Sequence, residues 1–175
     1  GYRPIKVGEN WGGNGKSGWF KIRFALPPSF AGKPSAALIN IGFEGCVFVD
    51  GAPHQGVDRW HEEVLLAEKS EPGAKYELVI EAMSGEYWQN RTEPAVFKRA
   101  EIATINREVN DYWYALGFLL QLAETLPEKS VRRARLIRGL NKSVNSFDLD
   151  NTDEDSLRQS AIEAYDKLKP LLEKK

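Results

Sequence analysis

The chain has 175 residues, of which 42% are hydrophobic and 28% charged, and its formal net charge is −1. This length gives room for one domain, or for a small domain with an appendage, and such a core needs no disulfide or metal to hold it together. The near-zero net charge argues against a broad nucleic-acid or anionic-membrane surface, so we expect neither as a partner.

The single cysteine indicates a reducing compartment, and the hydropathy gives no sign of a membrane span. Cys46 is the only cysteine, so it cannot form an internal disulfide. No apolar run approaches the roughly 20 residues that span a bilayer, and no signal peptide opens the chain. We therefore expect a cytoplasmic protein. Because the first residue is Gly1 rather than methionine, we also expect a piece of a longer polypeptide.

The stretch WGGNGKSGWF, residues 11–20, has the glycine pattern of a nucleotide-binding loop. Gly13, Gly15 and Gly18 spell GxGxxG, and GKS at residues 15–17 ends like a P-loop. Such loops need a helix N-terminus after them, so that backbone N–H groups meet the phosphates. Here the glycines run into a segment that alternates like a strand. We therefore expect a flexible loop rather than a phosphate site.

Residues 1–106 have the period of two that is typical of β-strands. Every second residue from Phe20 to Leu26 is apolar, and Pro27-Pro28 ends that strand. Asp50-Gly51 is a hairpin signal, because glycine tolerates the positive φ of such a turn. Further strands are expected at residues 37–43, 47–50, 62–66, 76–83 and 95–105. Short strands separated by turn signals predict an antiparallel, jelly-roll-like β-sandwich over residues 1–106.

Residues 107–175 have the helical period instead and predict a segment of about three helices. Ser130 is a good N-cap for the second helix and Thr152 for the third, where Asp153 and Glu154 complement the helix dipole. In the first helix we expect one apolar stripe to face the core. That stripe consists of Val109, Trp113, Leu116, Leu120 and Ala123 and is broadened by Tyr112, Leu119 and Leu126.

No compact set of metal ligands or catalytic residues stands out. The acidic stretch DLDNTDED, residues 148–155, lacks the glycine and the final glutamate of an EF-hand loop, and a capped helix start explains it better. His54 and His61 lie seven residues apart and have no compact spacing with Cys46. Nothing marks Cys46 as activated rather than buried between strands. We therefore predict no metal site and no catalytic residue in this chain.

The five tryptophans are the remaining candidates for a binding site. Aromatic rings fill cores, and when exposed they also stack on the apolar faces of sugars. Trp19 and Trp113 lie inside periodic segments, so we expect them to be packed. Trp60, beside Asp58 and Arg59, and Trp88, in the loop 84–93, either contact a sugar or lie buried under a neighbouring domain.

Several segments, taken in order, resemble the N-terminal region of family 38 glycoside hydrolases, of the cytosolic and vacuolar α-mannosidase type. They are GWFKIRFALP, INIGFEGCVFVDGAPHQGVDR and AEIATINREVNDYWYALGFLLQLAETLPEKSVRRARLIRGLNKSVNSFD. The most specific piece is AEIATINREVNDYWYAL, where a strand passes into an aromatic-rich helix. The second is LPEKSVRRA followed by FDLD. The resemblance covers nearly the whole chain.

The resemblance implies a β-sandwich followed by helices that lead into a catalytic domain. In that family the catalytic domain holds zinc through histidine and aspartate ligands and carries an aspartate nucleophile. No such motif occurs in this chain, so no catalytic residue is carried over. We expect no cofactor in this segment and zinc in the catalytic domain of the parent protein.

Two hypotheses of different classes follow. In the first, the parent hydrolyses terminal α-mannose residues, and this non-catalytic segment packs against its own catalytic domain or against neighbouring subunits of a homo-oligomer. In the second, the chain is a free-standing module that binds mannose-containing glycans through Asp58, Arg59, Trp60 and Trp88. A third interpretation, an independent enzyme, requires mannosidase turnover by the isolated segment.

Overall fold

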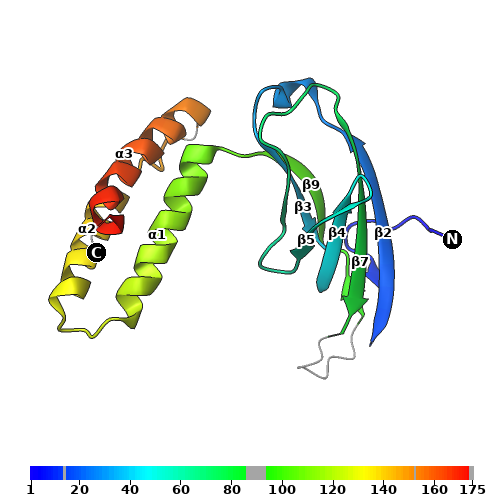
Figure 1. The fold of residues 1–175 in the computed structure, drawn as a ribbon, viewed down its shortest axis with the longest axis horizontal. Helices are drawn as coiled ribbons and strands as arrows, with labels where there is room; N and C mark the ends of the chain where they lie inside the picture. Colours follow the sequence, from blue (N-terminus) through cyan, green and yellow to red (C-terminus); the bar gives the residue numbers. More distant parts are fainter. Residues whose placement is uncertain (14, 86–93, 152, 174–175) are drawn as a thin grey trace. The chain divides into compact units, whose positions relative to one another are not determined.

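The computed structural model describes residues 1–13, 15–85, 94–151 and 153–173. The chain divides into two compact units, Gly1–Ile105 and Asn106–Lys175. The first unit is built of strands and the second of helices (Figure 1). The two units are described separately below.

The first unit is an antiparallel β-sandwich, as predicted. One sheet has the strand order β2-β7-β4-β5, a second has the order β6-β3-β9, and β1 pairs with β8. Every pairing in the described part of the unit is antiparallel. The strands are β1 (Asn10–Trp11), β2 (Lys16–Ala25), β3 (Ser35–Asn40), β4 (Glu44–Val49), β5 (Ala52–Val57), β6 (Glu63–Ala67), β7 (Lys75–Ser84), β8 (Ala95–Val96) and β9 (Arg99–Thr104), with a 3-10 turn at Pro28–Phe30.

Turn chemistry explains where several strands end. The hairpin predicted at Asp50-Gly51 joins β4 to β5, with φ of 48° at Asp50 and 85° at Gly51. Positive φ at both central residues matches the right-handed twist of the flanking strands. The single strand predicted over residues 95–105 is wrong. The chain there changes partner, because Phe97 bonds to Glu9 through its N–H whereas Lys98 bonds to Asn40, which splits the segment into β8 and β9.

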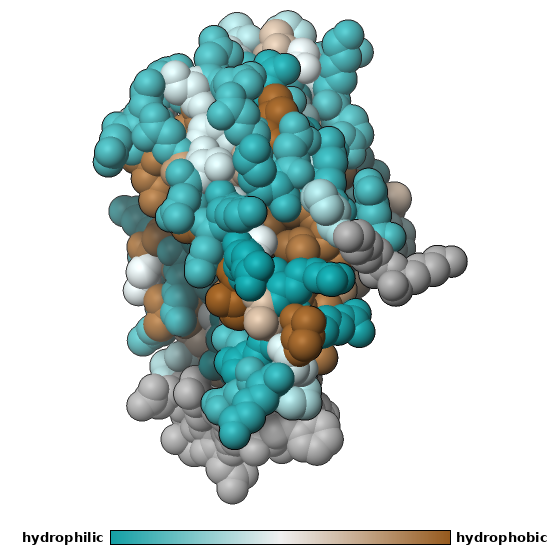
Figure 2. Space-filling view, turned by 90° about the vertical axis from the view of Figure 1, so that its left-hand side faces the viewer, coloured by the Kyte–Doolittle hydropathy of each residue, from teal (hydrophilic) through white to brown (hydrophobic). Residues whose placement is uncertain are grey.

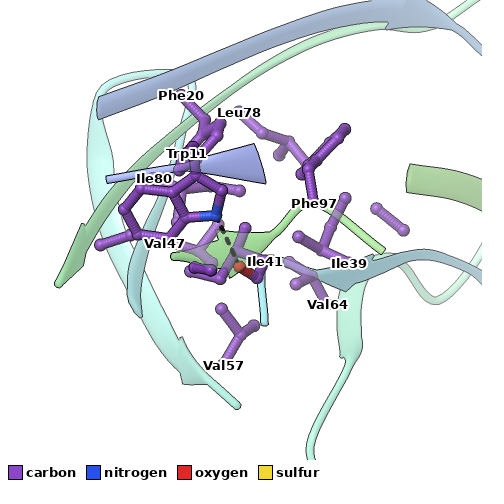
Figure 3. Packing of buried hydrophobic residues seen from close by; sticks show 13 residues of the cluster. Trp11, Phe20, Ile39, Ile41, Val47, Val57, Val64, Leu78, Ile80 and Phe97 are labelled. Atoms are coloured by element: carbon purple, nitrogen blue, oxygen red, sulfur yellow. Dashed lines mark hydrogen bonds between the residues drawn. The ribbon is translucent and has the colours of Figure 1, made fainter. Parts of the chain in front are cut away.

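Side chains from the four-stranded and three-stranded sheets meet in one buried cluster (Figure 3). Trp11 anchors it from β1: the indole Nε1–H donates to the carbonyl oxygen of Ile41 at 2.8 Å. Phe20 packs edge-on against Trp11 and stacks on Phe97. The cluster comprises Trp11, Phe20, Ala37, Ile39, Ile41, Val47, Val57, Val64, Leu78, Ile80, Ala82, Ala95 and Phe97.

The second unit contains α1 (Arg107–Thr125), α2 (Val131–Val144) and α3 (Glu154–Leu172), as the helical period predicted. Side-chain oxygens cap all three N-termini. Asn106 accepts from the N–H of Val109, and Ser130, the predicted cap, accepts from Arg133. The predicted cap of α3, Thr152, is wrong by one residue and lies outside the described residues. Asp153 is the N-cap and accepts from Ser156 at 3.0 Å, where its charge also complements the helix dipole.

The helices bury a second core of their own. Inside it the Ser143 hydroxyl donates to the carbonyl oxygen of Ala164 at 2.7 Å and lies 3.3 Å from the Tyr112 hydroxyl, so these polar groups have partners. Hydrophilic residues cover most of the surface that faces the viewer in Figure 2. The buried residues are Tyr112, Leu119, Ala123, Leu136, Leu140, Ala161, Ala164 and Leu168.

The stripe predicted for α1 is partly wrong. Val109, Leu116 and Ala123 do pack in the core, but Trp113 is 70% exposed and Leu120 is 47% exposed. The centre of the buried face lies instead at Tyr112 and Leu119. Because successive residues differ by about 100° around a helix, Trp113 and Leu120 fall to one side of that face. The residues that were expected only to broaden the stripe, Tyr112 and Leu119, are therefore the centre of packing in α1, and Trp113 and Leu120 were wrongly included.

Gly42, in the connection between β3 and β4, provides a stability test. Gly42 has a φ of 86°, and a Cβ placed on it would lie 2.6 Å from the carbonyl oxygen of Val96. Gly51 has nearly the same φ but open space around it. We expect Gly51→Ala to cost about 1–2 kcal/mol of unfolding free energy for the left-handed backbone alone. Gly42→Ala should cost at least about 1 kcal/mol more in urea denaturation, and equal losses would contradict this close approach.

A second test concerns the Trp11 anchor. Trp11→Phe removes the indole donor, leaves the buried Ile41 carbonyl without that bond and opens space in the core. The expected loss is about 2–4 kcal/mol by chemical denaturation. Trp60→Phe is the matched control, because Trp60 is 72% exposed. It should change stability by less than about 0.5 kcal/mol.

Candidate functional site

A shallow cavity of about 620 Å³ lies on the outward face of the four-stranded sheet. We call it the sheet depression and define it by Glu44, Cys46, Gly56, Asp58, His61 and Glu81, all of which line it. Alternation along the strands explains its position. Val47 and Ile80, the neighbours of Cys46 and Glu81 along their strands, are buried in the sandwich core, so Cys46 and Glu81 face outward.

Strand register brings three of these lining residues and Trp19 into one row. Trp19 on β2 lies opposite Glu81 on β7, Glu81 opposite Cys46 on β4, and Cys46 opposite Gly56 on β5. Neighbouring strands are about 4.8 Å apart, so the row is about 14 Å long. It runs from an aromatic ring through a carboxylate to two small residues. The depression therefore has a low floor at Cys46 and Gly56, while Trp19 does not line it but lies next to Glu81 on the same sheet face.

Trp19 is half-exposed at 50% and stacks on Phe48, with ring centroids 6.3 Å apart. The expectation that Trp19 is packed in the core is therefore wrong. The strand itself carried the signal, because Trp19 alternates with the buried Phe20 and shares a face with Lys21 and Arg23. Cys46 is likewise exposed rather than buried between strands.

The carboxylates of this sheet differ in their partners. Glu77, near the other end of β7, forms ion pairs with Arg23 and Lys21, and hydrogen bonds from Arg23 and then Lys21 lower its pKa below the usual value. Glu44 and Glu81 have no ion-pair or hydrogen-bond partner among the described residues. The depression thus gathers carboxylates whose acceptor oxygens are available to a ligand.

The loop after β5 is held by Asp58. Its Oδ1 accepts from the backbone N–H groups of Trp60 at 2.7 Å and His61 at 2.8 Å, and it lies 3.0 Å from His61 Nδ1. Burial raises the pKa of the Asp58 carboxyl, but the side-chain hydrogen bond with His61 and the two backbone N–H donors outweigh it, and the net pKa is lowered. Asp58 is thus occupied in shaping the loop that edges the depression.

Of the sugar-binding residues predicted from sequence, Asp58, Arg59 and Trp60 come together on this loop. The Arg59 guanidinium lies 4.2 Å from the centroid of the Trp60 ring and so covers part of one face. Trp60 is exposed but does not line the depression, whereas Asp58 does. Trp88 lies outside the described residues. Sequence reasoning missed Glu44 and Glu81 in the depression itself and Trp19 beside it.

The glycine-rich stretch has a structural role. Gly12, Gly13 and Gly15 all have positive φ, and the chain enters strand β2 directly at Lys16, as predicted, rather than a helix. The Ser84 hydroxyl bonds with the backbone of this turn: it accepts from the N–H of Gly13 and contacts the carbonyl oxygens of Gly13 and Lys16. The turn is therefore tied to the end of β7.

Acidic residues elsewhere also serve the backbone. Asp148 Oδ1 accepts from the N–H of Asp150, and Asp153 caps α3. Among the described residues, no group of three or more His, Cys, Asp or Glu side chains is placed to hold a metal ion. Within the same residues, every helix is too short or too polar to cross a membrane.

The Asp58 loop predicts a specific titration. A depressed pKa means that the carboxylate stabilises the loop fully above its unfolded pKa of 3.8 and loses that effect as the pH falls through the lower folded value. NMR titration of the Asp58 carboxyl carbon should give a midpoint below 3.8, and His61→Ala should move it upward. A midpoint at or above 3.8 in the unmodified chain would contradict the hydrogen-bonded loop.

Comparison with known proteins identifies the sandwich. The family model described as "Alpha-mannosidase, jelly roll domain" matches residues 1–111, which confirms the predicted jelly-roll-like sandwich. The chain is 26% identical over 166 residues to "Alpha-mannosidase G" of Dictyostelium discoideum, covering 86% of this chain and 15% of that protein. It is 25% identical over 161 residues to "Alpha-mannosidase 2C1" of Homo sapiens, covering 84% and 16%.

The chain thus spans about one sixth of the length of these curated relatives. A solved structure described as "CBM51-2 in complex with GlcNAc and INT domains from Clostridium perfringens ZmpB" is 12% identical, covers 86% of this chain and 34% of that one, and has a TM-score of 0.24, too low to define a shared fold. The family match covers more than half of the residues. The chain therefore belongs to the α-mannosidase jelly roll domain family.

Proposed function

We propose that this chain is the N-terminal, non-catalytic part of an α-mannosidase that hydrolyses terminal α-mannose residues, and that it packs against and positions the catalytic domain. The proposal is supported by relatives that are α-mannosidases about six times longer than the matched region. One observation on the chain itself carries it: α1 has a second apolar face that the helical core does not use.

This second face, the outer face of α1, consists of Trp113, Tyr114, Phe118 and Leu120. Trp113 is 70% exposed, and Tyr114 and Phe118 are each 61% exposed. At about 100° per residue, Trp113 and Leu120 form one apolar ridge, and Tyr114 and Phe118 form another. Large contiguous apolar patches are uncommon on the surfaces of monomeric proteins and mark interaction sites.

Gly117 lies between the two ridges. A Cβ placed on it would meet nothing within 4 Å, so nothing in the helical unit requires a glycine there. Glycine inside a helix costs about 1 kcal/mol relative to alanine. A flat strip between two aromatic ridges lets another backbone approach closely, and burying each large side chain would contribute about 1–2 kcal/mol. The occupant we propose is the remainder of the same polypeptide.

The chemistry of hydrolysis would belong to that remainder. The described residues do not fit the zinc site expected in the catalytic domain, because none of their His, Cys, Asp and Glu side chains form a group of three or more that could hold a metal. We assign them no catalytic step. A cytoplasmic location is part of the proposal and is supported by the single, exposed cysteine.

Gly117→Ala tests the docking role. In the 175-residue chain it should raise the unfolding free energy by about 0.5–1 kcal/mol, because it adds helix propensity in open space. In the complete polypeptide the added methyl group would separate α1 from its neighbour, so the residual mannosidase activity after heating should fall. Lys167→Ala, at an exposed position on α3, is the control and should leave that activity unchanged.

Equal stabilisation of the chain and of the complete polypeptide by Gly117→Ala would reject this contact. The other possible occupant of this face is a second copy of the chain. Sedimentation of the 175-residue chain and of its Trp113→Ala variant tests for it. A dimer that dissociates on Trp113→Ala would assign the outer face of α1 to a second copy, and would overturn docking of the catalytic domain at this face.

A further inference from the structure

We infer that the sheet depression, with Trp19 beside it, binds a neutral hexose unit of a glycan. Of the described loop residues that the sequence suggested, Asp58 lines this site and Trp60 does not, and the site stands apart from the docking role of α1. The inference rests on three features of one sheet face: an oriented aromatic ring, carboxylate acceptors without cationic partners, and a floor kept low by small residues.

The aromatic ring supplies the apolar part of sugar recognition. A pyranose presents a patch of C–H groups on one face, and a flat, partly exposed indole can stack against it. Trp19 is half-exposed, and its contact with Phe48 at an interplanar angle of 28° orients the ring before any ligand arrives. A preoriented side chain loses little conformational entropy on binding.

The carboxylates supply the polar part. Glu81 is next to Trp19 in the row, and Glu44 is diagonal to Glu81 across β7 and β4. Diagonal neighbours lie about 7 Å apart, a spacing that allows the two carboxylates to accept from different hydroxyl groups of one hexose. Hydrogen bonds to an ionised acceptor are stronger than bonds between neutral groups.

The charge of the lining selects a neutral ligand. Lys21 and Arg23, which share this sheet face, are paired with Glu77 further along β7. The lining residues include three carboxylates and no lysine or arginine. An anionic ligand, such as a sugar phosphate, would therefore be repelled. Recognition of a quaternary ammonium cation typically uses a cage of aromatic rings, whereas the lining residues include no aromatic side chain.

A substitution at Gly56, on the floor of the depression, can block the site without disturbing the core. Gly56 faces outward between the half-buried Gln55 and the buried Val57, and a Cβ placed on it would meet only the Gly45 carbonyl oxygen, at an ordinary 3.8 Å. Its φ is not in the left-handed region, so a β-branched residue fits the strand backbone. Gly56→Val should therefore fill the depression and keep the fold.

The test is an NMR titration of the 175-residue chain with methyl α-mannopyranoside. We expect saturable shifts at residues 44–46, 56 and 81, with a Kd of about 1 mM. Trp19→Ala should weaken binding about tenfold, Glu81→Gln severalfold, and Gly56→Val should abolish it. The sugar should also slow alkylation of the exposed Cys46, which lies on the floor.

Two controls match the key variants. Glu77→Gln changes a paired carboxylate on the same strand, and Trp60→Ala removes an exposed tryptophan outside the depression. Neither should alter the Kd. The inference is overturned by an absence of saturable shifts, by sugar binding that survives both Trp19→Ala and Gly56→Val, or by tighter binding of tetramethylammonium than of the mannoside. None of these outcomes bears on the docking of α1, which Gly117→Ala tests separately.

Discussion

The removal of apolar side chains from water is the constraint on which both units depend. Each unit meets it with its own closed core, and in each core the buried polar groups of the anchoring residues have partners: the Trp11 indole with the Ile41 carbonyl, and the Ser143 hydroxyl with the Ala164 carbonyl. The outer face of α1 departs from it, because four large apolar side chains are exposed there. α1 thus has two apolar faces. One is buried in the helical core, and the proposed docking on the catalytic domain would bury the other.

The tryptophans show how differently one residue type is used in this chain. Trp11 fastens the short strand β1 to the sandwich core, Trp19 lies beside the sheet depression, Trp60 lies on the Asp58 loop beside Arg59, and Trp113 belongs to the outer face of α1. Only Trp11 among these four is buried. The tryptophans of this chain therefore lie on exposed surfaces as well as in the core. Both proposals, glycan binding and docking, depend on those exposed rings.

Local signals in the sequence predicted the features that depend on a few consecutive residues. The Asp50-Gly51 hairpin and the Ser130 cap follow from backbone preferences and short-range hydrogen bonds, and alternation with turn signals was enough to predict an antiparallel sandwich. The prediction of one strand over residues 95–105 was wrong because Phe97 and Lys98 form backbone hydrogen bonds with different segments that are distant in sequence. No local pattern reveals such a change of partner. In α1 the predicted stripe wrongly included Trp113 and Leu120, because apolar residues occur on two faces of this helix and periodicity alone could not tell which face is buried.

The candidate site was harder to predict than the fold because its residues become neighbours only through the register of the paired strands. Trp19, Glu81 and Cys46 are far apart in sequence and become neighbours only when β2, β7 and β4 pair. The polar face of β2 did include Trp19, yet its size suggested a core residue. The loop Asp58–His61 was accessible to sequence reasoning because its members are consecutive, and the structure shows that their contacts with one another shape the loop.

The central claim, that the outer face of α1 is covered in the working enzyme, is tested most directly by hydroxyl-radical footprinting. Oxidation of Trp113, Tyr114 and Phe118 would be measured by mass spectrometry in the 175-residue chain and in the complete polypeptide. The account predicts rapid oxidation of all three rings in the chain, where they are exposed, and strong protection in the complete polypeptide. Equal oxidation in both would contradict it.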